Sequence, residues 1–289
     1  MLYKKAYAKI NLGLEVVGKR RDGYHDLKMF NVAIDLYDEL FFSLDKDLIV
    51  ESDLEFTEIK NNLIYKTAKL IKERYNVQKG AKIELVKNIR IGGGLAGGSS
   101  NAAITIIALN KLWDLNLSLE AMLNIAKEIG SDVPFCLYGK PAIVEGVGDI
   151  ITLYPFNKEI YFVLVFPDFT CSTKEIFAKH ELKKESNAFD KLLSTLEKQD
   201  INLIGESIFN DLEVTVDKLL IKENKPINRI KTALIASGAL GAAMTGSGST
   251  IYGITDSLEN AKIIKEKLDK QLQKVEISIT KIRKWWKKL

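Results

Sequence analysis

Residues 92–100 read Gly-Gly-Gly-Leu-Ala-Gly-Gly-Ser-Ser, so five of the chain's 19 glycines lie in one short stretch. A strand-like run, residues 83–91, precedes it, and a helix-like run from about Ser99 to Trp113, whose one charged residue is Lys111, follows it. Glycine lets the backbone approach a ligand closely, and the first turn of a helix offers free N–H groups with a partial positive charge. The stretch therefore predicts a phosphate-binding loop between a strand and a helix.

Three familiar nucleotide-binding patterns do not explain this loop. Gly92-x-Gly94-x-x-Gly97 matches the dinucleotide fingerprint, but no apolar strand ends at Asp114, where the acidic residue would stand. A Walker A loop needs a lysine after its last glycine, and this chain has Ser99 there. The HRD and DFG triplets of protein kinases do not occur in the sequence. The loop must therefore bind phosphate by another scheme.

Composition and charge narrow the function classes. The chain has 289 residues, of which 46% are hydrophobic and 28% charged, which is typical of a folded protein with two domains. The formal net charge is +4, but five basic residues crowd the last nine positions, so the other 280 residues carry about −1. A nucleic-acid surface would spread its positive charge over the body of the protein. We therefore expect no nucleic-acid partner, and we interpret the tail with Trp285 and Trp286 as a surface appendage.

Few side chains are available for disulfides or a zinc site. Cys136 and Cys171 are the only cysteines, and His25 and His180 the only histidines, with no CxxC or HExxH spacing. We expect both cysteines to be reduced. The uncharged stretches 91–110 and 232–255 contain many Gly, Ser and Thr residues, and the first residues lack the apolar core of a signal peptide. The sequence thus predicts a cytoplasmic, soluble protein with no membrane partner.

The hydrophobic pattern alternates strands and helices. Residues 6–16 alternate with period two, which predicts a strand whose more polar face carries Lys9 and Asn11. Asp22-Gly23 marks a turn, and Ser118 is a candidate N-cap of a helix that ends near Gly130. Further elements are expected at 27–42 (strand), 62–75 (helix), 161–167 (strand), 173–235 (polar helices), 240–254 (strand, turn, strand), 256–268 (helix) and 275–279 (strand). This order favours an α+β protein with domains at 1–154 and 155–289.

Four segments in order resemble a known family. The segments AKINL (8–12), GGGLAGGSS (92–100), GSDVP (130–134) and TGSGS (245–249) are similar to the three motifs of the GHMP kinases. That superfamily includes galactokinase, homoserine kinase, mevalonate kinase and phosphomevalonate kinase. The resemblance covers roughly residues 4–255. The segments RDGYHDL (21–27) and EGVG (145–148) narrow it to members that act on a cytidine diphosphate-linked methylerythritol in the non-mevalonate (MEP) route to isoprenoid precursors.

The resemblance implies a fold, a reaction and a phosphoryl donor. The implied fold is a ribosomal-S5-like, ATP-binding N-terminal domain and a ferredoxin-like C-terminal domain, with the active site in the cleft between them. The implied activity is a transferase: ATP with Mg²⁺ phosphorylates the 2-hydroxyl of the small-molecule substrate. Two alternatives stay open, namely another GHMP kinase of the homoserine or mevalonate type and a catalytically silent S5-like module that binds a nucleotide or RNA. Tyr24 and His25 argue against the first, and Lys9 with Asp132 argues against the second.

Lys9 and Asp132 are the candidate catalytic residues. From the sequence alone Asp132 is an N-cap, because it follows a helix-ending glycine and precedes Val-Pro, and Lys9 is a solvated lysine. The resemblance instead makes Asp132 the general base. Lys9 then lies beside it and stabilises the charge that develops on the acceptor oxygen.

The resemblance also implies a binding site for the acceptor. Tyr24 and Phe177 would stack on the two faces of the cytosine, and His25 would meet its Watson–Crick edge. From the sequence alone, Tyr24 and His25 are ordinary loop residues and Phe177 is a core residue of a short helix. Asn11 and Thr173 are expected to contact the substrate. Gly246 and Gly248 would let a second turn approach it closely.

The remaining implied residues bind ATP. Asn62 and Lys87 would border the nucleotide base, and Ser100 would meet Mg²⁺ or a phosphate oxygen. Arg90 stands where the family usually has proline, and Ala96 where it usually has glycine; we expect little harm from Ala96, whereas Arg90 could alter how the chain enters the loop. The ATP-binding residues of the loop are Arg90, Ile91, Gly92, Gly93, Gly94, Leu95, Ala96, Gly97, Gly98, Ser99 and Ser100.

Overall fold

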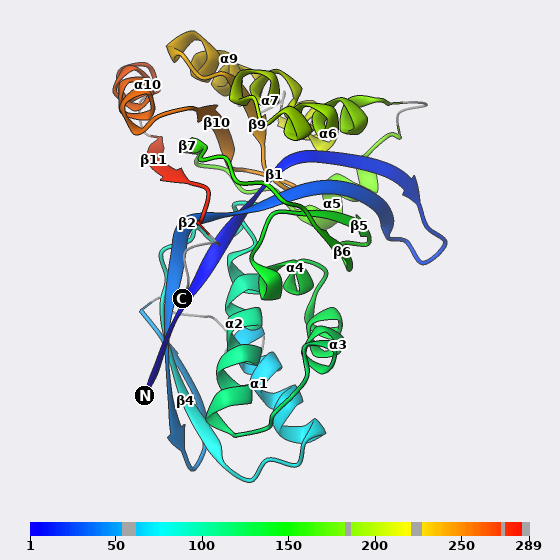
Figure 1. Ribbon diagram of the computed structural model, residues 1–289, viewed down its shortest axis with the longest axis vertical. Helices are drawn as coiled ribbons and strands as arrows, with labels where there is room; N and C mark the ends of the chain where they lie inside the picture. The colour runs from blue at the N-terminus through cyan, green and yellow to red at the C-terminus, as the bar shows by residue number, and fades with distance from the viewer. Residues whose placement is uncertain (54–61, 183–185, 221–226, 273–274, 285–289) are drawn as a thin grey trace. The chain divides into compact units, whose positions relative to one another are not determined.

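The structure, a computed structural model, describes residues 1–53, 62–182, 186–220, 227–272 and 275–284 (Figure 1). The chain forms two compact units. Unit 1 comprises Met1–Lys9, Leu36–Ile91 and Ala96–Gly139, and unit 2 comprises Ile10–Asp35, Gly92–Leu95 and Lys140–Leu289. These units interleave along the chain, whereas the sequence predicts one division between residues 154 and 155. That single division stays a prediction.

Two long strands, β1 (Leu2–Lys19) and β2 (His25–Asp45), belong to both units and are neighbours in one sheet. The predicted Asp22-Gly23 turn joins them: Asp22 Oδ1 accepts a hydrogen bond from Tyr24 N–H, and Gly23 has φ +87°. The predicted alternation of β1 holds only in part. Residues 8–14 are all buried, so the expected polar face with Lys9 and Asn11 is covered as well.

Unit 1 packs helices on a small sheet. β4 (Gly80–Val86) pairs parallel with β3 (Leu48–Ser52) and antiparallel with the second half of β2. Helix α2 (Gly97–Leu112) contacts α1 (Leu63–Arg74), α3 (Leu119–Ile129) and α4 (Val133–Tyr138), and Figure 1 shows α1 and α2 side by side. Ile106 and Leu109 of α2 are fully buried, each worth about 1.5–3 kcal/mol. This burial explains why α2 carries so few charges.

Strand β4 ends five residues before the predicted strand does. The sequence predicts a strand over 83–91, but the structure ends it at Val86. The buried Asp38 explains the difference, because its Oδ1 accepts hydrogen bonds from the N–H groups of Asn88 (2.8 Å) and Ile89 (2.7 Å). A carboxylate that binds two successive N–H groups takes them away from a strand ladder. Residues 87–91 therefore form a shaped connection into the glycine loop.

Unit 2 contains a four-stranded antiparallel sheet. Its order is β11 (Glu276–Lys281), β7 (Tyr161–Phe166), β10 (Ile251–Thr255) and β9 (Gly241–Met244). Helices α9 (Ile227–Ser237) and α10 (Leu258–Gln271) pack on it. With strands counted along the chain, this is the 4-1-3-2 order of a βαββαβ unit. The predicted ferredoxin-like arrangement and the predicted α+β class are thereby confirmed.

The rest of unit 2 surrounds the two long strands. β5 (Ala142–Gly146) pairs antiparallel with the first half of β2 and with β6 (Ile150–Leu153), and the two-residue strand β8 (Phe209–Asn210) pairs parallel with β1. The predicted polar helices appear as α5 (Thr173–Lys179), α6 (Ala188–Lys198), α7 (Ile201–Ser207) and α8 (Leu212–Leu220). β8 interrupts them, and the sequence gives no sign of it.

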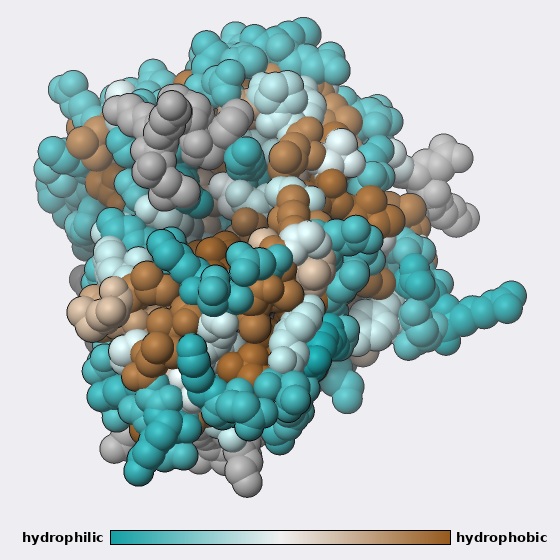
Figure 2. Space-filling view, turned by 60° about the horizontal axis from the view of Figure 1, so that its bottom comes forward, coloured by the Kyte–Doolittle hydropathy of each residue, from teal (hydrophilic) through white to brown (hydrophobic). Residues whose placement is uncertain are grey.

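One face of the molecule is partly apolar. Figure 2 shows a face on which apolar residues (brown) gather and are bordered by hydrophilic ones (teal). Among the described helices, none is long and apolar enough to cross a membrane.

The predicted tail begins as part of unit 2, since Ile282 bridges to Ile34 and Lys284 pairs with Glu159 at 2.7 Å. Trp285 and Trp286 lie outside the described residues.

Candidate active site

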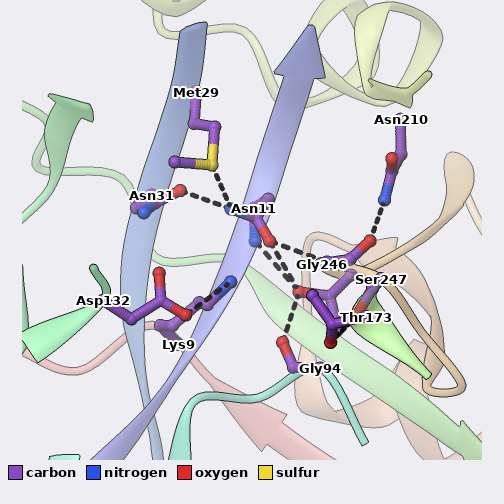
Figure 3. Close-up of polar contacts among 11 residues, drawn as sticks. Lys9, Asn11, Met29, Asn31, Gly94, Asp132, Thr173, Asn210, Gly246 and Ser247 are labelled. Atoms are coloured by element: carbon purple, nitrogen blue, oxygen red, sulfur yellow. Dashed lines mark hydrogen bonds and ion pairs between the residues drawn. The ribbon is translucent and has the colours of Figure 1, made fainter. Parts of the chain in front are cut away.

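A lysine and an aspartate form a partly buried ion pair in unit 1. Lys9 Nζ lies 3.9 Å from Asp132 Oδ2 (Figure 3). Lys9 is 3% exposed, whereas the side chain of Asp132 is 31% exposed. A buried ammonium is costly unless a charge partner or hydrogen bonds compensate it. The structure thus brings together the two predicted catalytic residues, and Lys9 is not the solvated lysine that the sequence alone favours.

Asp132 does occupy the N-cap position of α4, which is the role that the sequence alone favours. A capping aspartate accepts a hydrogen bond from an N–H of the first helical turn. Within the described chain the Asp132 side chain makes no such bond, and the turn closes instead through Val133 N–H, which donates to Gly130 O at 3.1 Å. The carboxylate therefore faces Lys9 and is accessible to a ligand.

The glycine loop leads into the start of α2. Gly92 and Gly94 have φ angles of +71° and +74°, and Ala96 at the N-cap position has φ +55°. No side chain of the described residues caps α2, and its first turn carries no acid. The first N–H groups of a helix have no partner within the helix, and the helix dipole adds positive charge there. This end of a 16-residue helix is suited to an anion.

The two residues predicted to border the nucleotide base lie beside the same helix start. A Cβ on Gly97 would lie 3.1 Å from Lys87 Nζ, and a Cβ on Gly98 would lie 3.5 Å from Leu63 Cδ1, next to Asn62. Asn62 has a structural task, because its Oδ1 caps α1 by accepting from Ile64 N–H at 2.8 Å. The first turns of α1 and α2 and the Lys87 side chain are thus neighbours in unit 1.

Lys87 is held by a carboxylate that the sequence did not single out. Its Nζ lies 2.8 Å from Oδ2 and 3.1 Å from Oδ1 of Asp38, whose side chain is fully buried. Lys87 also donates to the carbonyl oxygen of Ile89. Burial lowers the pKa of Lys87, and Asp38 opposes that shift. Asp38 therefore fixes both a lysine beside the helix start and the backbone that leads to the loop.

A second glycine turn packs directly on the loop. In unit 2, Gly246 and Gly248 have φ +57° and +83°. Thr250 N–H donates to Gly93 O at 3.3 Å, and Thr245 Oγ1 donates to Gly94 O at 3.4 Å. A Cβ on Gly94 would lie only 2.2 Å from Thr245 O. The two glycine segments therefore meet backbone to backbone, which side chains larger than hydrogen would prevent.

Asn11 connects that turn to the long strands. It is fully buried, and its Oδ1 accepts from Gly246 N–H at 2.8 Å (Figure 3). The same Oδ1 lies 3.1 Å from Thr245 Oγ1, whose single hydroxyl proton is shared between Asn11 Oδ1 and Gly94 O. Its Nδ2 donates to Asn31 Oδ1 at 2.6 Å and contacts Met29 Sδ at 3.4 Å. The amide is thus engaged on both sides by the protein itself. Its predicted contact with substrate stays a prediction, and the structure adds a role in holding the turn.

Two of the predicted cytosine-binding residues lie together in unit 2. The rings of His25 and Phe177 have centroids 5.3 Å apart and are tilted by 34°. His25 is 6% exposed, and burial, followed by the charge of Lys19, lowers its pKa. Phe177 is half-buried; the core residue of α5 is its neighbour Ile176. The neutral imidazole beside an accessible aromatic ring is a reasonable platform for a planar base.

The other predicted acceptor residues are more exposed. Tyr24 is 64% exposed, at the tip of the β1–β2 hairpin. Thr173, the first residue of α5, is also exposed, and its Oγ1 lies 2.7 Å from Ser247 Oγ of the second glycine turn. Thr173 is therefore tied to that turn, whereas the backbone N–H of Tyr24 bonds to Asp22 of the hairpin.

Comparison with known proteins decides the family. A family model described as the GHMP kinases N terminal domain matches residues 62–140, and one described as GHMP kinases C terminal matches residues 192–274. A curated 4-diphosphocytidyl-2-C-methyl-D-erythritol kinase of Thermoanaerobacter pseudethanolicus is 44% identical over 264 residues, which is 89% of this chain and 89% of that protein. The chain belongs to the GHMP kinases. The resemblance inferred from the four segments is confirmed.

Solved structures support this GHMP kinase assignment. A crystal structure of a 4-(cytidine 5'-diphospho)-2C-methyl-D-erythritol kinase has a TM-score of 0.80 at 27% identity and covers 98% of this chain and 100% of that one. A homoserine kinase from Cytophaga hutchinsonii has a TM-score of 0.78 at 20% identity, with 98% and 94% covered, which shows the shared fold alone. The predicted two-domain GHMP kinase fold is confirmed, and the enzyme is a small-molecule kinase that phosphorylates an alcohol group.

GHMP kinases use ATP as phosphoryl donor, and the residues here fit it. The uncapped start of α2 and the positive φ angles of Gly92 and Gly94 form a backbone cradle of donors for phosphate. In the described part of the chain, no three His, Cys, Asp or Glu side chains gather to hold a metal by themselves. Mg²⁺ usually keeps several waters and binds substrate phosphates together with one or two protein ligands.

Sequence reasoning missed the residues that hold this kinase site in shape. Asp38, Asn210 and Glu213 each hold backbone near one of the two glycine segments. Each lies in an ordinary amphipathic context, and the backbone groups that it binds near the glycine segments are at least 50, 34 and 31 residues away from it, respectively. No spacing along the chain connects such partners. Polar residues beside predicted apolar strands were the only available signal.

Proposed function

We propose that this GHMP kinase transfers the γ-phosphoryl group of ATP to the 2-hydroxyl of 4-diphosphocytidyl-2-C-methyl-D-erythritol, a step of the non-mevalonate route to isoprenoid precursors. The observation that carries the chemistry is the Lys9–Asp132 pair, in which the carboxylate caps no helix and faces a buried ammonium. The curated relative at 44% identity bears the name of this activity, which supports the choice of substrate.

Asp132 and Lys9 would activate the hydroxyl. The acceptor oxygen bonds to the γ-phosphorus, the bond from that phosphorus to the oxygen of ADP breaks, and the hydroxyl proton passes to Asp132. Phosphoryl transfer depends mainly on positioning and on stabilising charge. Lys9 has the second task, because its ammonium lies close enough to stabilise both the Asp132 carboxylate and the oxygen that loses its proton.

The glycine loop and its neighbours would bind the donor. Backbone N–H groups of residues 92–98 and the start of α2 cradle the phosphates. Asn62 and Lys87 border the base, and Lys87 adds a positive charge beside Gly97. Ser100 would hold Mg²⁺ together with phosphate oxygens, and the ion would supply neutralisation of the phosphate charge. Arg90 adds a further positive charge at the start of the loop.

The His25–Phe177 pair would recognise the cytidine. Phe177 offers a ring face for stacking, and His25, whose pKa is lowered, offers a neutral nitrogen and its backbone to the edge of the base. Tyr24 would close over the other face, and Thr173, Asn11, Gly246 and Gly248 would contact the polyol part of the substrate. Homoserine and mevalonate carry no base to stack, so this pair favours the cytidyl substrate over those of other GHMP kinases. The nucleotide-linked substrate supports a cytoplasmic enzyme with no nucleic-acid or membrane partner.

One experiment separates the candidate functions. ADP release from ATP is measured with the purified protein and four additions: the cytidyl-methylerythritol, homoserine, mevalonate and no acceptor. We expect release above background with the cytidyl substrate only, and its dependence on added Mg²⁺ tests the metal. Equal release with homoserine or mevalonate would assign another GHMP kinase activity. Release with none of them, although an ATP analogue binds, would favour the silent nucleotide-binding module.

A further inference from the structure

We propose that Asn210 and Glu213 are positioning residues of the phosphoryl transfer: they hold the second glycine turn, residues 245–248, and through it Gly93 and Gly94 of the phosphate loop. We call these two side chains the 210–213 clamp. The proposal rests on the proposed function for its kinetic readout, but its structural basis lies entirely within unit 2.

Asn210 holds the turn from one side. Its Nδ2 donates to the carbonyl oxygens of Met244 and Gly246, both at 2.8 Å (Figure 3 shows the bond to Gly246). Its Oδ1 accepts from Leu212 N–H at 2.9 Å, which fixes the orientation of the amide. Asn210 is 5% exposed and lies on β8, beside Leu14 of β1. A buried amide with both ends engaged has one favourable orientation, so it constrains the peptide units on both sides of Thr245.

Glu213 holds the strand end that leads into the turn. Its Oε1 accepts from Met244 N–H at 2.7 Å, and its other carboxylate oxygen pairs with Lys231. Met244 is thus bound at its N–H by Glu213 and at its carbonyl by Asn210. On the opposite side, Asn11 Oδ1 accepts from Gly246 N–H. The backbone from Met244 to Gly246 therefore has side-chain partners on both of its edges.

The turn passes this constraint to the phosphate loop because there is no free space between them. Thr245 and Thr250 donate to Gly94 O and Gly93 O. A Cβ on Gly94 would lie 3.0 Å from Gly248 O, besides the closer approach to Thr245 O, and a Cβ on Gly246 would lie 3.0 Å from Gly94 O. Packed backbones of this kind shift together. Ser247, within the turn, also contacts Thr173, a predicted acceptor residue.

The clamp should therefore affect alignment of the reactants more than binding of the cytidine. A displacement of about 1 Å between reacting groups can cost on the order of 10²-fold in rate. The bonds of the clamp go to Met244, Gly246, Leu212 and Lys231, and the rings of His25 and Phe177 pack on each other. Loss of the clamp is expected to lower kcat and ATP affinity and to leave cytidine binding unchanged.

The test compares Asn210→Ala with Asn110→Ala. Asn110 is a matched control, because its amide oxygen and amide nitrogen likewise both bond to backbone, at Leu117 N–H (2.9 Å) and Leu117 O (3.4 Å), and it lies at the far end of α2 from the loop. We measure kcat and both KM values, the affinities for a nonhydrolysable ATP analogue and for cytidine 5'-diphosphate by calorimetry, and thermal unfolding. A second pair, Glu213→Ala and Glu213→Gln, tests the other half of the clamp.

We expect Asn210→Ala to lower kcat by about 10- to 100-fold and to lower the affinity for the ATP analogue at least threefold. Its affinity for cytidine diphosphate should stay within twofold of wild type. Asn110→Ala should lose comparable thermal stability and keep kcat within twofold. Glu213→Gln retains the acceptor for Met244 N–H and should rescue most of the kcat that Glu213→Ala loses. A kcat of Asn210→Ala within twofold of wild type, or a parallel loss of cytidine diphosphate affinity, would overturn the proposal.

Two further outcomes are covered by the design. If Asn210→Ala does not fold, the two Glu213 variants test the proposal by the same criteria. Equal kcat values of Glu213→Ala and wild type would then reject it. If the wild type does not phosphorylate the cytidyl substrate, the proposed function fails. The analogue titration then judges the clamp by itself, and an affinity of Asn210→Ala equal to that of the wild type would reject it.

Discussion

Lys9 Nζ lies 3.9 Å from Asp132 Oδ2, with the lysine side chain 4% exposed and the aspartate 31% exposed. The carboxylate contributes to compensating the charge of the buried lysine, and it also meets solvent. Such a pair holds one charge in place and offers the other to a ligand. The absence of a capping bond from Asp132 to α4 in the described chain separates its chemistry from helix stability.

Asp132→Asn should therefore lower kcat strongly and stability little. Loss of the general base is expected to cost about 10²- to 10⁴-fold in kcat. Ser118→Ala is the matched control, because Ser118 does cap a helix, accepting from Ala121 N–H at 3.2 Å. That variant should lose about 1 kcal/mol of unfolding free energy and keep its kcat. A kcat of Asp132→Asn within threefold of wild type would make the carboxylate catalytically unimportant.

Gly94→Ala should weaken ATP binding. The new Cβ would lie 2.2 Å from Thr245 O, and the residue has φ +74°, which side chains rarely adopt. We expect at least a tenfold loss of affinity for an ATP analogue, with cytidine diphosphate affinity within twofold of wild type, both measured by calorimetry. Gly18→Ala is the control, because a Cβ there meets nothing within 4 Å. Unchanged analogue affinity in Gly94→Ala would show that the loop does not cradle phosphate.

Ala96→Gly should stabilise the protein. Ala96 has φ +55° at the N-cap position of α2, where the backbone conformation of a residue with a Cβ costs roughly 1–2 kcal/mol. Glycine removes that cost, but its greater conformational entropy in the unfolded chain offsets part of the gain. We expect a gain of about 0.5–1 kcal/mol in urea unfolding, with little change in kcat. A loss of stability would mean that contacts of the Ala96 methyl group outweigh the backbone strain.

The base specificity should follow the His25–Phe177 pair. Uracil reverses the donor and acceptor pattern of cytosine at positions 3 and 4, and each unpaired buried polar group costs about 1–3 kcal/mol. We expect kcat/KM for the uridine analogue to fall by up to ~10⁴-fold if two groups are mismatched. Phe177→Ala should weaken the binding of both substrates alike. His25→Ala should narrow the difference in kcat/KM between the cytidine and uridine substrates. Equal use of both substrates by the wild type would remove the cytidine assignment and leave the kinase assignment intact.

The lowered pKa of His25 predicts a decline of stability in mild acid. At pH values above about 6.5, the imidazole is neutral in both the folded and the unfolded chain. As the pH falls below that value, the unfolded chain takes up a proton first, so the free energy of unfolding decreases until the folded protein is protonated as well. Urea unfolding at pH 7.5, 6.5 and 5.5 should therefore show a smaller decline for His25→Gln than for wild type. Equal declines would contradict the assigned pKa direction.

Much of the fold could be predicted from local pattern. The Ser118 cap, the Asp22-Gly23 turn, the two strands around residues 245–250 and the start of α2 all follow from side-chain chemistry within a few residues. The failures have a common cause. Strand β4 stops at Val86 because Asp38, about 50 residues earlier, binds the next N–H groups, and no local preference of residues 87–91 expresses that.

The candidate site divides in the same way. The glycine loop and the order of the motifs are visible in the sequence, because a phosphate cradle needs glycine at fixed local positions and a helix directly after it. By itself the sequence therefore determined the glycine loop before a helix, the alternation of strands and helices and, by resemblance, the family. It left two interpretations open for Asp132, a helix N-cap or a general base, and two for Lys9, a solvated lysine or a residue of the active site.

Tertiary structure showed that Asp132 makes no capping bond within the described chain and that Lys9 is buried, and it added the residues that support the loop. Only the fold buries Lys9 against Asp132, and only the fold places the Thr245–Gly248 turn against Gly94 with no room for a Cβ. Asn210 reaches carbonyls 34 and 36 residues away, and Asn11 reaches an N–H 235 residues away. Hydrogen bonds and ion pairs act over about 3–4 Å of space whatever the separation along the chain. The local sequence reflects the conformational preferences of each residue, whereas the folded backbone determines which partners lie within that distance.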